Sequence, residues 1–277
     1  MSFPTGTCDT HLHVYDNRYS VASTATICPP DAPIDEYRLV QRALGIDRVV
    51  LVQPTTYGLD NRCQIEAAAG FGDAARLVVV VNSHTPDTEL ERLHGLGARG
   101  ARFHMLPGGA VDWDELADTA AHVAELGWHI QLQMDGNLLP DRLGALLALP
   151  TDLVVDHVGR FMPPPSPESE AVGALLALLD TGRCWVKLSA PYESTHAGAP
   201  HYPAVTALVD RLVALAPERM LWATNWPHPN QDEPLTADQL AHLAHRWLPD
   251  ETIRRQVLVT NPQLRYDFAP PHQGDPT

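Results

Sequence analysis

The chain has 277 residues, 44% of them hydrophobic and 19% charged, with a formal net charge of −15 at pH 7. This composition is typical of a soluble globular enzyme rather than of a disordered or fibrous chain. Because a strongly negative surface repels nucleic acid and anionic membranes, we expect neither as a partner. A small-molecule substrate is the expected partner, and self-association into a homo-oligomer is left open.

Four cysteines lie far apart in the sequence, at Cys8, Cys28, Cys63 and Cys184. They form no C-x-x-C motif and no dense framework, which favours free thiols in a reducing compartment. The first residues contain no basic stretch followed by an apolar one, and no run of about 18 apolar residues occurs. We therefore expect a cytoplasmic protein.

Short apolar runs recur along the whole chain. They predict eight strands, at residues 7–15, 48–54, 76–82, 100–105, 128–134, 151–158, 184–190 and 220–227. The clearest runs are continuously apolar, without alternation, as expected for strands that helices bury on both faces.

Stretches of helical length separate these strands. Apolar residues spaced by three and four predict helices at residues 35–45, 60–72, 86–97, 112–126, 138–148, 168–181, 202–216 and 236–248. Strict alternation of eight strands and eight helices predicts a single-domain (β/α)8 barrel over residues 1–268, followed by a flexible tail at 269–277. An open doubly wound sheet is the alternative, but no glycine-rich phosphate loop follows an early strand.

Polar residues at the predicted strand ends point to a site. His11 and His13 are two residues apart on the first strand, so both imidazoles project from one face. His157 follows the sixth strand and Asn225 follows the eighth. Because the carboxyl ends of barrel strands surround the active site, we expect these three imidazoles and one carboxamide to converge. The proline-rich segment 161–167 predicts either a stiff lid at this end or a surface connector.

Eight segments in order resemble the amidohydrolase superfamily, in the branch containing 2-pyrone-4,6-dicarboxylate lactonase and related sugar-lactone hydrolases and isomerases. The resemblance extends from Cys8 to Phe268 and rests on residues 9–13, 52–62, 100–103, 127–129, 155–160, 187–191, 222–230 and 261–262. It implies a lactone carbonyl that is polarised by the histidines and attacked by water, with a strand-eight carboxylate as the base.

The resemblance also bears on metal. The pyrone lactonases work without a tightly held ion, whereas other members bind one or two divalent ions through the same histidines and acid. Here no lysine ends the fourth strand, and His129 lies near the wrong end of the fifth, so a binuclear site lacks ligands. We therefore favour no cofactor. If one ion is bound, zinc or manganese on His11, His13 and His157 is expected.

Asn225 stands where the family has an aspartate. A carboxamide has no useful proton affinity near neutral pH, and loss of a general base typically costs about a hundredfold to ten-thousandfold in rate. Three explanations stay open: an inactivating substitution made to trap a ligand, a natural variant with a different reaction, or a binding protein that no longer turns over.

The pocket is expected to favour a substrate with one acidic group or none. Arg102 ends the fourth strand and matches an arginine of the family that can fork onto a carboxylate. The further arginines of the pyrone lactonases are missing from the corresponding segments. The other candidates for substrate contact are Thr55, Tyr57, His104, Met105, Met134, Arg160, Tyr192 and His228.

These residues support three functional hypotheses. The first is a hydrolase that opens the ring ester of a small oxygenated lactone, with His11, His13 and His157 stabilising the oxyanion. The second is a lactone isomerase or a non-hydrolytic lyase or decarboxylase, in which Asn225 only forms hydrogen bonds and His157 or Tyr57 moves protons. The third is a small-molecule binder without turnover. Label from 18O-water enters the product acid only in the first.

Overall fold

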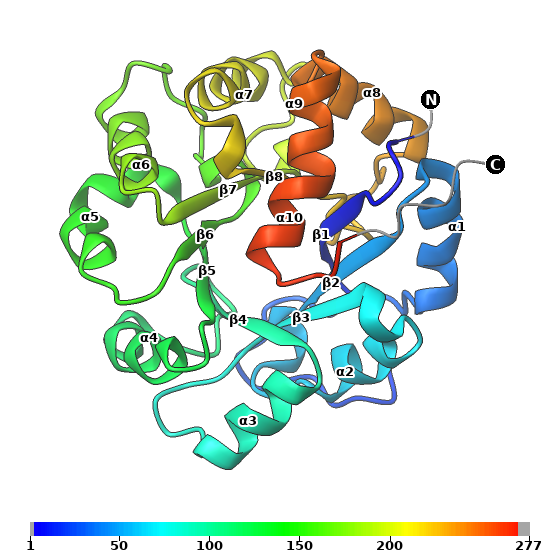
Figure 1. The fold of residues 1–277 in the computed structure, drawn as a ribbon, viewed down its shortest axis with the longest axis vertical. Coiled ribbons are helices and arrows are strands. Elements are labelled where there is room, and N and C mark those ends of the chain that lie inside the picture. The colour runs from blue at the N-terminus through cyan, green and yellow to red at the C-terminus, as the bar shows by residue number, and fades with distance from the viewer. Residues whose placement is uncertain (1–2, 271–277) are drawn as a thin grey trace.

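A computed structural model describes residues 3–270. Eight parallel strands form one sheet in chain order, and each pairs with the next (Figure 1). They are β1 (Cys8–Leu12), β2 (Arg48–Val52), β3 (Ala75–Val79), β4 (Ala98–His104), β5 (His129–Gln133), β6 (Leu153–Val155), β7 (Cys184–Leu188) and β8 (Met220–Trp222). All eight predicted strands are present.

The sheet closes where β1 meets the segment after β8. Leu12 forms a parallel bridge with Trp226, the amide of His13 donates to the carbonyl of Trp226 at 2.8 Å, and the amide of Asn225 donates to the carbonyl of His11 at 2.9 Å. The predicted (β/α)8 barrel is therefore confirmed, and the open-sheet alternative is wrong. Closure also brings Asn225 beside His11 of β1 and His13, which directly follows β1.

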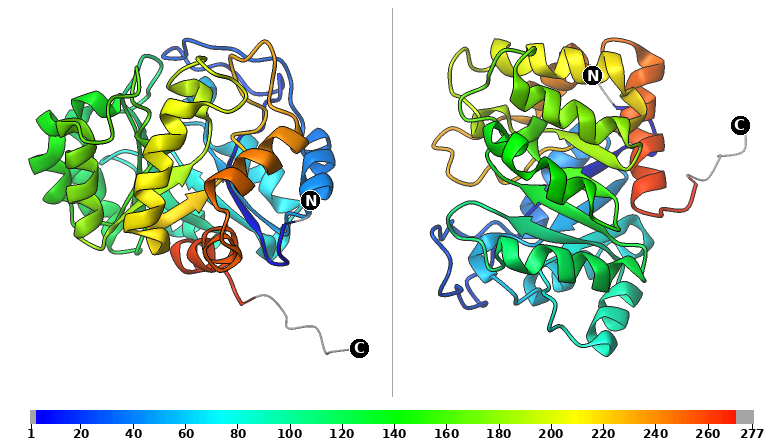
Figure 2. Two further views of the ribbon diagram at one scale, coloured as in Figure 1. Left: turned by 90° about the horizontal axis from the view of Figure 1, so that it is seen from above. Right: turned by 90° about the vertical axis from the view of Figure 1, so that its left-hand side faces the viewer.

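A helix follows each strand and lies on the outside of the barrel (Figures 1 and 2). These helices are α1 (Ile34–Leu44), α2 (Arg62–Ala69), α3 (Asp87–Gly95), α4 (Leu116–Ala124), α5 (Leu139–Leu147), α6 (Glu170–Asp180), α7 (Pro203–Leu215) and α8 (Ala237–Trp247). Short 3₁₀ turns lie at Thr55–Tyr57, Gly72–Ala74, Trp113–Glu115, Gly136–Leu138, His157–Gly159, Pro191–Glu193 and Pro217–Arg219.

Three further helical pieces, which the sequence pattern did not predict, follow α8. They are α9 (Glu251–Arg255), a π turn (Gln256–Thr260) and α10 (Asn261–Arg265). The side chain of Arg265 pairs with Asp152, just before β6, and the ring of Tyr266 contacts His129, the first residue of β5. The segment from α9 to α10 thus covers the amino-terminal end of the barrel (Figure 2). Of the predicted tail, residues 271–277 lie outside the described residues.

A layer of apolar side chains fills part of the barrel interior. Val50, Val52 and Val78 pack there with Val154 and Leu221, and all five are fully buried. Alternate residues of the same strands, such as Val49 and Leu51, pack outward into the main core. Burial on both faces explains why the strands are continuously apolar.

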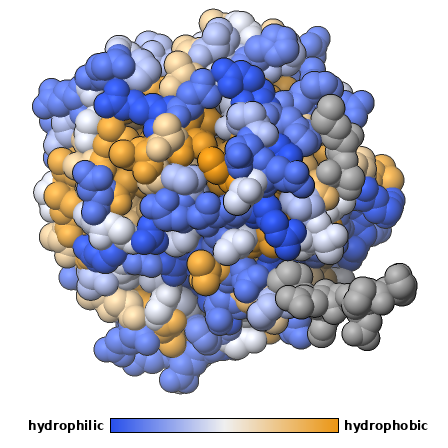
Figure 3. All heavy atoms as spheres, turned by 45° about the horizontal axis from the view of Figure 1, so that its top comes forward, coloured by the Kyte–Doolittle hydropathy of each residue, from blue (hydrophilic) through white to orange (hydrophobic). Residues whose placement is uncertain are grey.

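The surface and the cysteines can be compared with the expectations from the sequence. On the face drawn in Figure 3, hydrophilic side chains cover most of the surface, and apolar ones show in the hollows between them. Between residues 3 and 270, no helix has the length and apolar character needed to cross a membrane. The four cysteines are free, and Cys28 alone among them is exposed.

Candidate active site

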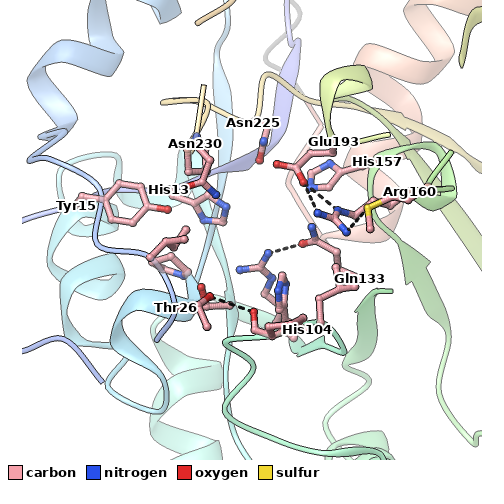
Figure 4. Close-up of a pocket in the computed structure, with 18 residues that line it drawn as sticks. His13, Tyr15, Thr26, His104, Gln133, His157, Arg160, Glu193, Asn225 and Asn230 are labelled. Atoms are coloured by element: carbon pink, nitrogen blue, oxygen red, sulfur yellow. Dashed lines mark hydrogen bonds and ion pairs between the residues drawn. The ribbon is translucent and has the colours of Figure 1, made fainter. Parts of the chain in front are cut away.

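A cavity of about 210 Å³ opens at the carboxyl ends of the strands (Figure 4). Its floor and walls come from segments far apart in the sequence, because each strand of a barrel contributes its last residues to one rim. The residues that line it are His13, Tyr15, Thr26, Ile27, Pro54, Thr55, Arg102, His104, Leu106, Pro107, Gln133, His157, Arg160, Met162, Glu193, Asn225, Pro229 and Asn230.

The three predicted histidines do come together. The Nε2 atoms of His11 and His13 are 3.1 Å apart, and the ring centroids of His11 and His157 are 4.9 Å apart. His13 and His157 line the cavity, whereas His11 is fully buried directly behind them. His157 starts a 3₁₀ turn after β6 with a φ of 52°, and this turn holds its ring inward, where Nδ1 lies 2.9 Å from the hydroxyl of Ser189.

The positions of the ring protons follow from the partners. Nδ1 of His13 lies 2.7 Å from the carbonyl oxygen of Val52, which can only accept, so this nitrogen carries the proton. Nε2 of a neutral His13 is then an acceptor, and the facing Nε2 of His11 must donate to it. Burial lowers the pKa of His13 to about 3 and that of His11 and His157 well below the usual range, so all three are neutral at pH 7.

A buried polar layer lies beneath His11. The ammonium of Lys187 donates to Oε1 of Gln131 at 2.6 Å and lies 3.3 Å from Nδ1 of His11 and 3.6 Å from Oδ1 of Asp156. Gln131 also donates to Oδ2 of Asp156 at 3.1 Å. None of these side chains is exposed. They come from β5, the end of β6 and β7, directly above the apolar interior.

Asn225 has a backbone φ of 59°, a left-handed conformation that asparagine adopts more readily than most residues. Its Nδ2 donates to the hydroxyl of Tyr192 at 2.9 Å, and that hydroxyl lies 2.8 Å from Nδ1 of His228. The His228 ring also forms a backbone hydrogen bond with Leu235 that raises its pKa, as a carbonyl acceptor does. Burial is the larger effect and lowers the pKa to about 4, so the ring is neutral and its single proton points to Leu235.

This chain of hydrogen bonds has one direction. The hydroxyl of Tyr192 donates its only proton to Nδ1 of His228. Its oxygen must therefore accept a hydrogen bond from residue 225. An amide can donate that hydrogen bond, whereas an ionised carboxylate cannot. The other atom of the amide, Oδ1 of Asn225, is buried and has no partner among the described residues. Because Asn225 lines the cavity, a ligand hydroxyl is the natural donor to this oxygen (Figure 4).

Two arginines line the cavity with different partners. Arg102 is buried and donates to the carbonyl of Gln53 at 2.6 Å and to Oε1 of Gln133 at 2.7 Å, both neutral groups. Arg160 forms an ion pair with Glu193 at 2.7 Å. Only Arg102 of the two therefore retains a charge that no neighbouring carboxylate neutralises directly.

The remaining predicted contacts divide between the cavity and its surroundings. Thr55 and His104 line it. Tyr192 and His228 lie behind Asn225, in the hydrogen-bonded chain described above. The hydroxyl of Tyr57 instead bonds to the backbone of Asp16. Met134 is buried in the hydrophobic core, and Met105 packs against that core.

The sequence reading missed several polar residues of the site, among them Gln131, Gln133, Lys187 and Glu193. A usable signal was present in β5, where the two glutamines alternate with apolar residues in a strand that is otherwise buried. Met162, from the proline-rich segment, also lines the cavity, so this segment reaches the site at its start.

Asp9 lies near the histidines in the sequence but does not line the cavity. It accepts hydrogen bonds from the amide and hydroxyl of Thr224 and so joins β1 to the segment after β8.

His11, Asp156 and His157 form one group of potential metal ligands among residues 3–270, with ligand atoms within 4.8 Å of one another. Two imidazoles and a carboxylate are common ligands for zinc or manganese. However, Asp156 already faces the ammonium of Lys187, and the same ammonium lies beside His11. A divalent ion would add two positive charges next to a buried cation, without a new carboxylate, so the residues present do not fit one.

The chain is similar to known proteins over most of its length. A family model described as amidohydrolase matches residues 8–268. The chain is 37% identical over 276 residues to the D-galactarolactone isomerase of Agrobacterium fabrum, covering 97% of this chain and 94% of that protein. It is 34% identical over 281 residues to the 2-pyrone-4,6-dicarboxylate hydrolase of Comamonas testosteroni, covering 95% and 90%.

Two further proteins are similar to this chain. The 4-sulfomuconolactone hydrolase of Rhizobium radiobacter is 30% identical over 271 residues, covering 94% of this chain and 90% of that protein. A crystal structure of an Agrobacterium tumefaciens protein without ligand superposes with a TM-score of 0.91 at 36% identity, covering 97% of this chain and 98% of that one.

Proposed function

Because this chain belongs to the amidohydrolase family, we propose that it is an enzyme acting on the ring ester of a small hydroxylated lactone, and that it isomerises the lactone rather than opening it. Isomerisation is favoured by the series of hydrogen bonds from Asn225 through Tyr192 to His228. This series requires a hydrogen-bond donor at position 225. This favours a native amide over an inactivating substitution.

The proposed reaction moves an acyl group between two hydroxyl oxygens of the same substrate. One hydroxyl attacks the lactone carbonyl while its proton passes to the neutral imidazole of His157. The new C–O bond forms, the old ring C–O bond breaks, and the same imidazole returns the proton to the departing oxygen. No water is consumed, so no carboxylate is needed to deprotonate water.

The histidine pair would stabilise the charge that develops on the carbonyl oxygen. His11 donates its Nε2 proton to Nε2 of His13 in the absence of substrate, and this proton would be shared with the carbonyl oxygen once the lactone is bound. A donor of this kind typically contributes about 3 to 4 kcal/mol to the transition state. Asn225 would hold the attacking hydroxyl through Oδ1, since that oxygen has no partner in residues 3–270.

Hydrolysis is the second candidate. The relatives from Comamonas testosteroni and Rhizobium radiobacter are named hydrolases, and the imidazole cluster that would polarise the carbonyl does not depend on residue 225. Under this alternative a histidine would have to activate water without a strand-eight carboxylate. We rank it second for that reason.

The charges of the cavity suggest one carboxylate on the substrate. The guanidinium of Arg102 is buried and held by neutral partners, so its charge is available, whereas that of Arg160 is neutralised by Glu193. A lactone with a single acidic group and several hydroxyls fits this arrangement. We further propose that the reaction needs no divalent metal, because the ammonium of Lys187 lies beside the potential ligands.

A panel of five- and six-membered lactones, with and without a carboxylate, tests the proposal. The enzyme is incubated with each lactone, and the products are followed by 13C NMR while released acid is titrated. We expect a change of ring size without acid release. Acid release in step with lactone loss would support hydrolysis, and binding without turnover, even in Asn225→Asp, would support a non-enzymatic binder.

A further inference from the structure

Lys187 is an unusual residue in this chain. It is the only lysine in the sequence, where 19 residues are Lys or Arg, and it is fully buried inside the barrel. Lysine is rarely buried unless its charge is paired, because removing an ammonium from water is costly. The proposed reaction does not yet give this side chain a role.

The three donors of the ammonium match three nearby acceptors. Lys187 donates to Oε1 of Gln131 at 2.6 Å, lies 3.3 Å from Nδ1 of His11 and pairs with Asp156 at 3.6 Å. The carboxylate of Asp156 pairs with this group, and Oε1 of Gln131 can only accept from it, so the side chain is an ammonium. A lysine that stays charged can only donate to His11.

His11 has three candidate partners at Nδ1, and they require opposite tautomers. The amide Nε2 of Gln131, at 3.5 Å, is the most distant and already donates to Asp156 at 3.1 Å. Lys187 requires Nδ1 to accept, whereas Oδ1 of Asp156, at 3.3 Å, would require it to donate. The carbonyl of Val52 decides between these tautomers. It fixes the proton of His13 on Nδ1, so that Nε2 of His13 is an acceptor. His11 must then carry its proton on Nε2, as the contact with Lys187 also demands.

We infer that Lys187 is a positioning residue that holds His11 in the tautomer with the proton on Nε2. Without this donor, the carboxylate of Asp156 would draw a proton onto Nδ1, and two Nε2 lone pairs would face each other at 3.1 Å unless His11 became an imidazolium. The inference rests on the proposed function in one respect only, namely that the Nε2 proton of His11 polarises the lactone carbonyl. The tautomer itself can be observed without substrate.

15N NMR of protein labelled at histidine tests the tautomer directly. His11 is assigned from the signals lost in His11→Gln, and protonated and unprotonated ring nitrogens resonate far apart. The wild-type enzyme is expected to show His11 with Nε2 protonated and Nδ1 unprotonated. In Lys187→Met we expect Nδ1 to move to the protonated position. A protonated Nδ1 in the wild type, or an unprotonated one in Lys187→Met, would overturn the inference.

Two further variants separate the donor from general effects of burial. Lys187→Gln/Asp156→Asn removes both charges but keeps an amide donor, and it is expected to retain the wild-type tautomer even if Lys187→Met does not fold. A shift of Nδ1 to the protonated position in the double variant would contradict the inference. Arg48→Met removes another buried cation, one that donates to the carbonyls of Gly6 and Val259 and not to a group of the site, and it should leave His11 unchanged.

Kinetics provide the functional readout. Removing a group that orients a catalytic imidazole typically lowers activity by about 10- to 100-fold. We expect Lys187→Met to lower kcat by this factor with little change in KM, and Lys187→Gln/Asp156→Asn to recover part of the loss. If no lactone is turned over, the proposed function fails while the NMR result stands. If kcat is unchanged although the tautomer shifts, Lys187 does not position His11 for the reaction.

Discussion

The amide of Asn225 donates to the hydroxyl of Tyr192 at 2.9 Å, and this contact determines what the eighth strand contributes to the site. Oδ1 of Asn225 has no partner among the residues that the structure describes, so it can accept a hydrogen bond from a ligand. An aspartate at this position would instead require Tyr192 to turn its proton away from His228. The site is thus arranged to bind a hydroxyl group rather than to deprotonate water.

Tyr192→Phe should misalign Asn225 while leaving the fold intact. The variant loses the acceptor for Nδ2 and a donor to His228, so we expect kcat to fall by about tenfold and the free energy of unfolding by about 1 kcal/mol. Steady-state kinetics and urea unfolding measure both. Tyr57→Phe is the matched control, since its hydroxyl bonds to the backbone of Asp16, and equal losses of kcat in the two variants would contradict the assignment.

Arg102→Gln should weaken binding of acidic lactones selectively. A hydrogen bond to a charged group contributes about 1.5 to 3 kcal/mol, which corresponds to an increase in KM of about tenfold to a hundredfold. The same variant should keep its KM for a neutral lactone of equal size. If KM rises equally for both lactones, Arg102 supports the wall of the cavity and does not recognise a carboxylate.

The stability of the protein should fall when the pH drops below about 6.5. Burial lowers the pKa of His13 and His104 to about 3 and that of His228 to about 4, so below pH 6.5 each binds a proton only after unfolding. Each contributes a slope of about 1.4 kcal/mol per pH unit down to its folded pKa. Asp9, whose pKa burial raises to about 6, opposes this between about pH 4 and 6.

Urea unfolding at pH 7, 6 and 5 measures this dependence. The free energy of unfolding should decrease steadily with acidification, and His104→Gln should reduce the slope because it removes one of the buried imidazoles. A free energy that is constant from pH 7 to 5 would mean that these rings are not held neutral by burial.

Enzyme purified without added metal should contain less than one equivalent of zinc or manganese and should keep its activity after dialysis against a chelator. The reason is the ammonium of Lys187, which lies 3.3 Å from His11 and 3.6 Å from Asp156. Elemental analysis and activity before and after chelation measure this. Loss of activity that returns with one divalent ion would contradict the account.

Much of the fold follows from local patterns. Continuous apolar runs identify strands that are buried on both faces, and the spacing of His11 and His13 alone places two imidazoles on one side of a strand. Asn225 could be found because it follows the eighth run. The helices at Glu251–Arg255 and Asn261–Arg265 escaped prediction because they are short, and the second is held by distant contacts, since the side chain of Asn261 donates to the carbonyls of Pro217 and Met220.

The polar layer of the barrel could not be predicted in the same way. Whether Lys187 points into the barrel or toward a helix depends on which face of β7 turns inward, and the strand is buried on both. The hydroxyl of Tyr57 turns to the backbone of Asp16 because of the shape of a loop, which residue spacing does not encode. Such choices depend on tertiary contacts.

Reaction in 18O-labelled water, with mass analysis of the products of the wild type and Asn225→Asp, tests the central claim most directly. The wild-type enzyme should convert the lactone to an isomer that contains no label. Asn225→Asp should release some labelled open-chain acid, at a rate that rises with pH as the new carboxylate ionises. Labelled acid as the main product of the wild-type enzyme would contradict the account.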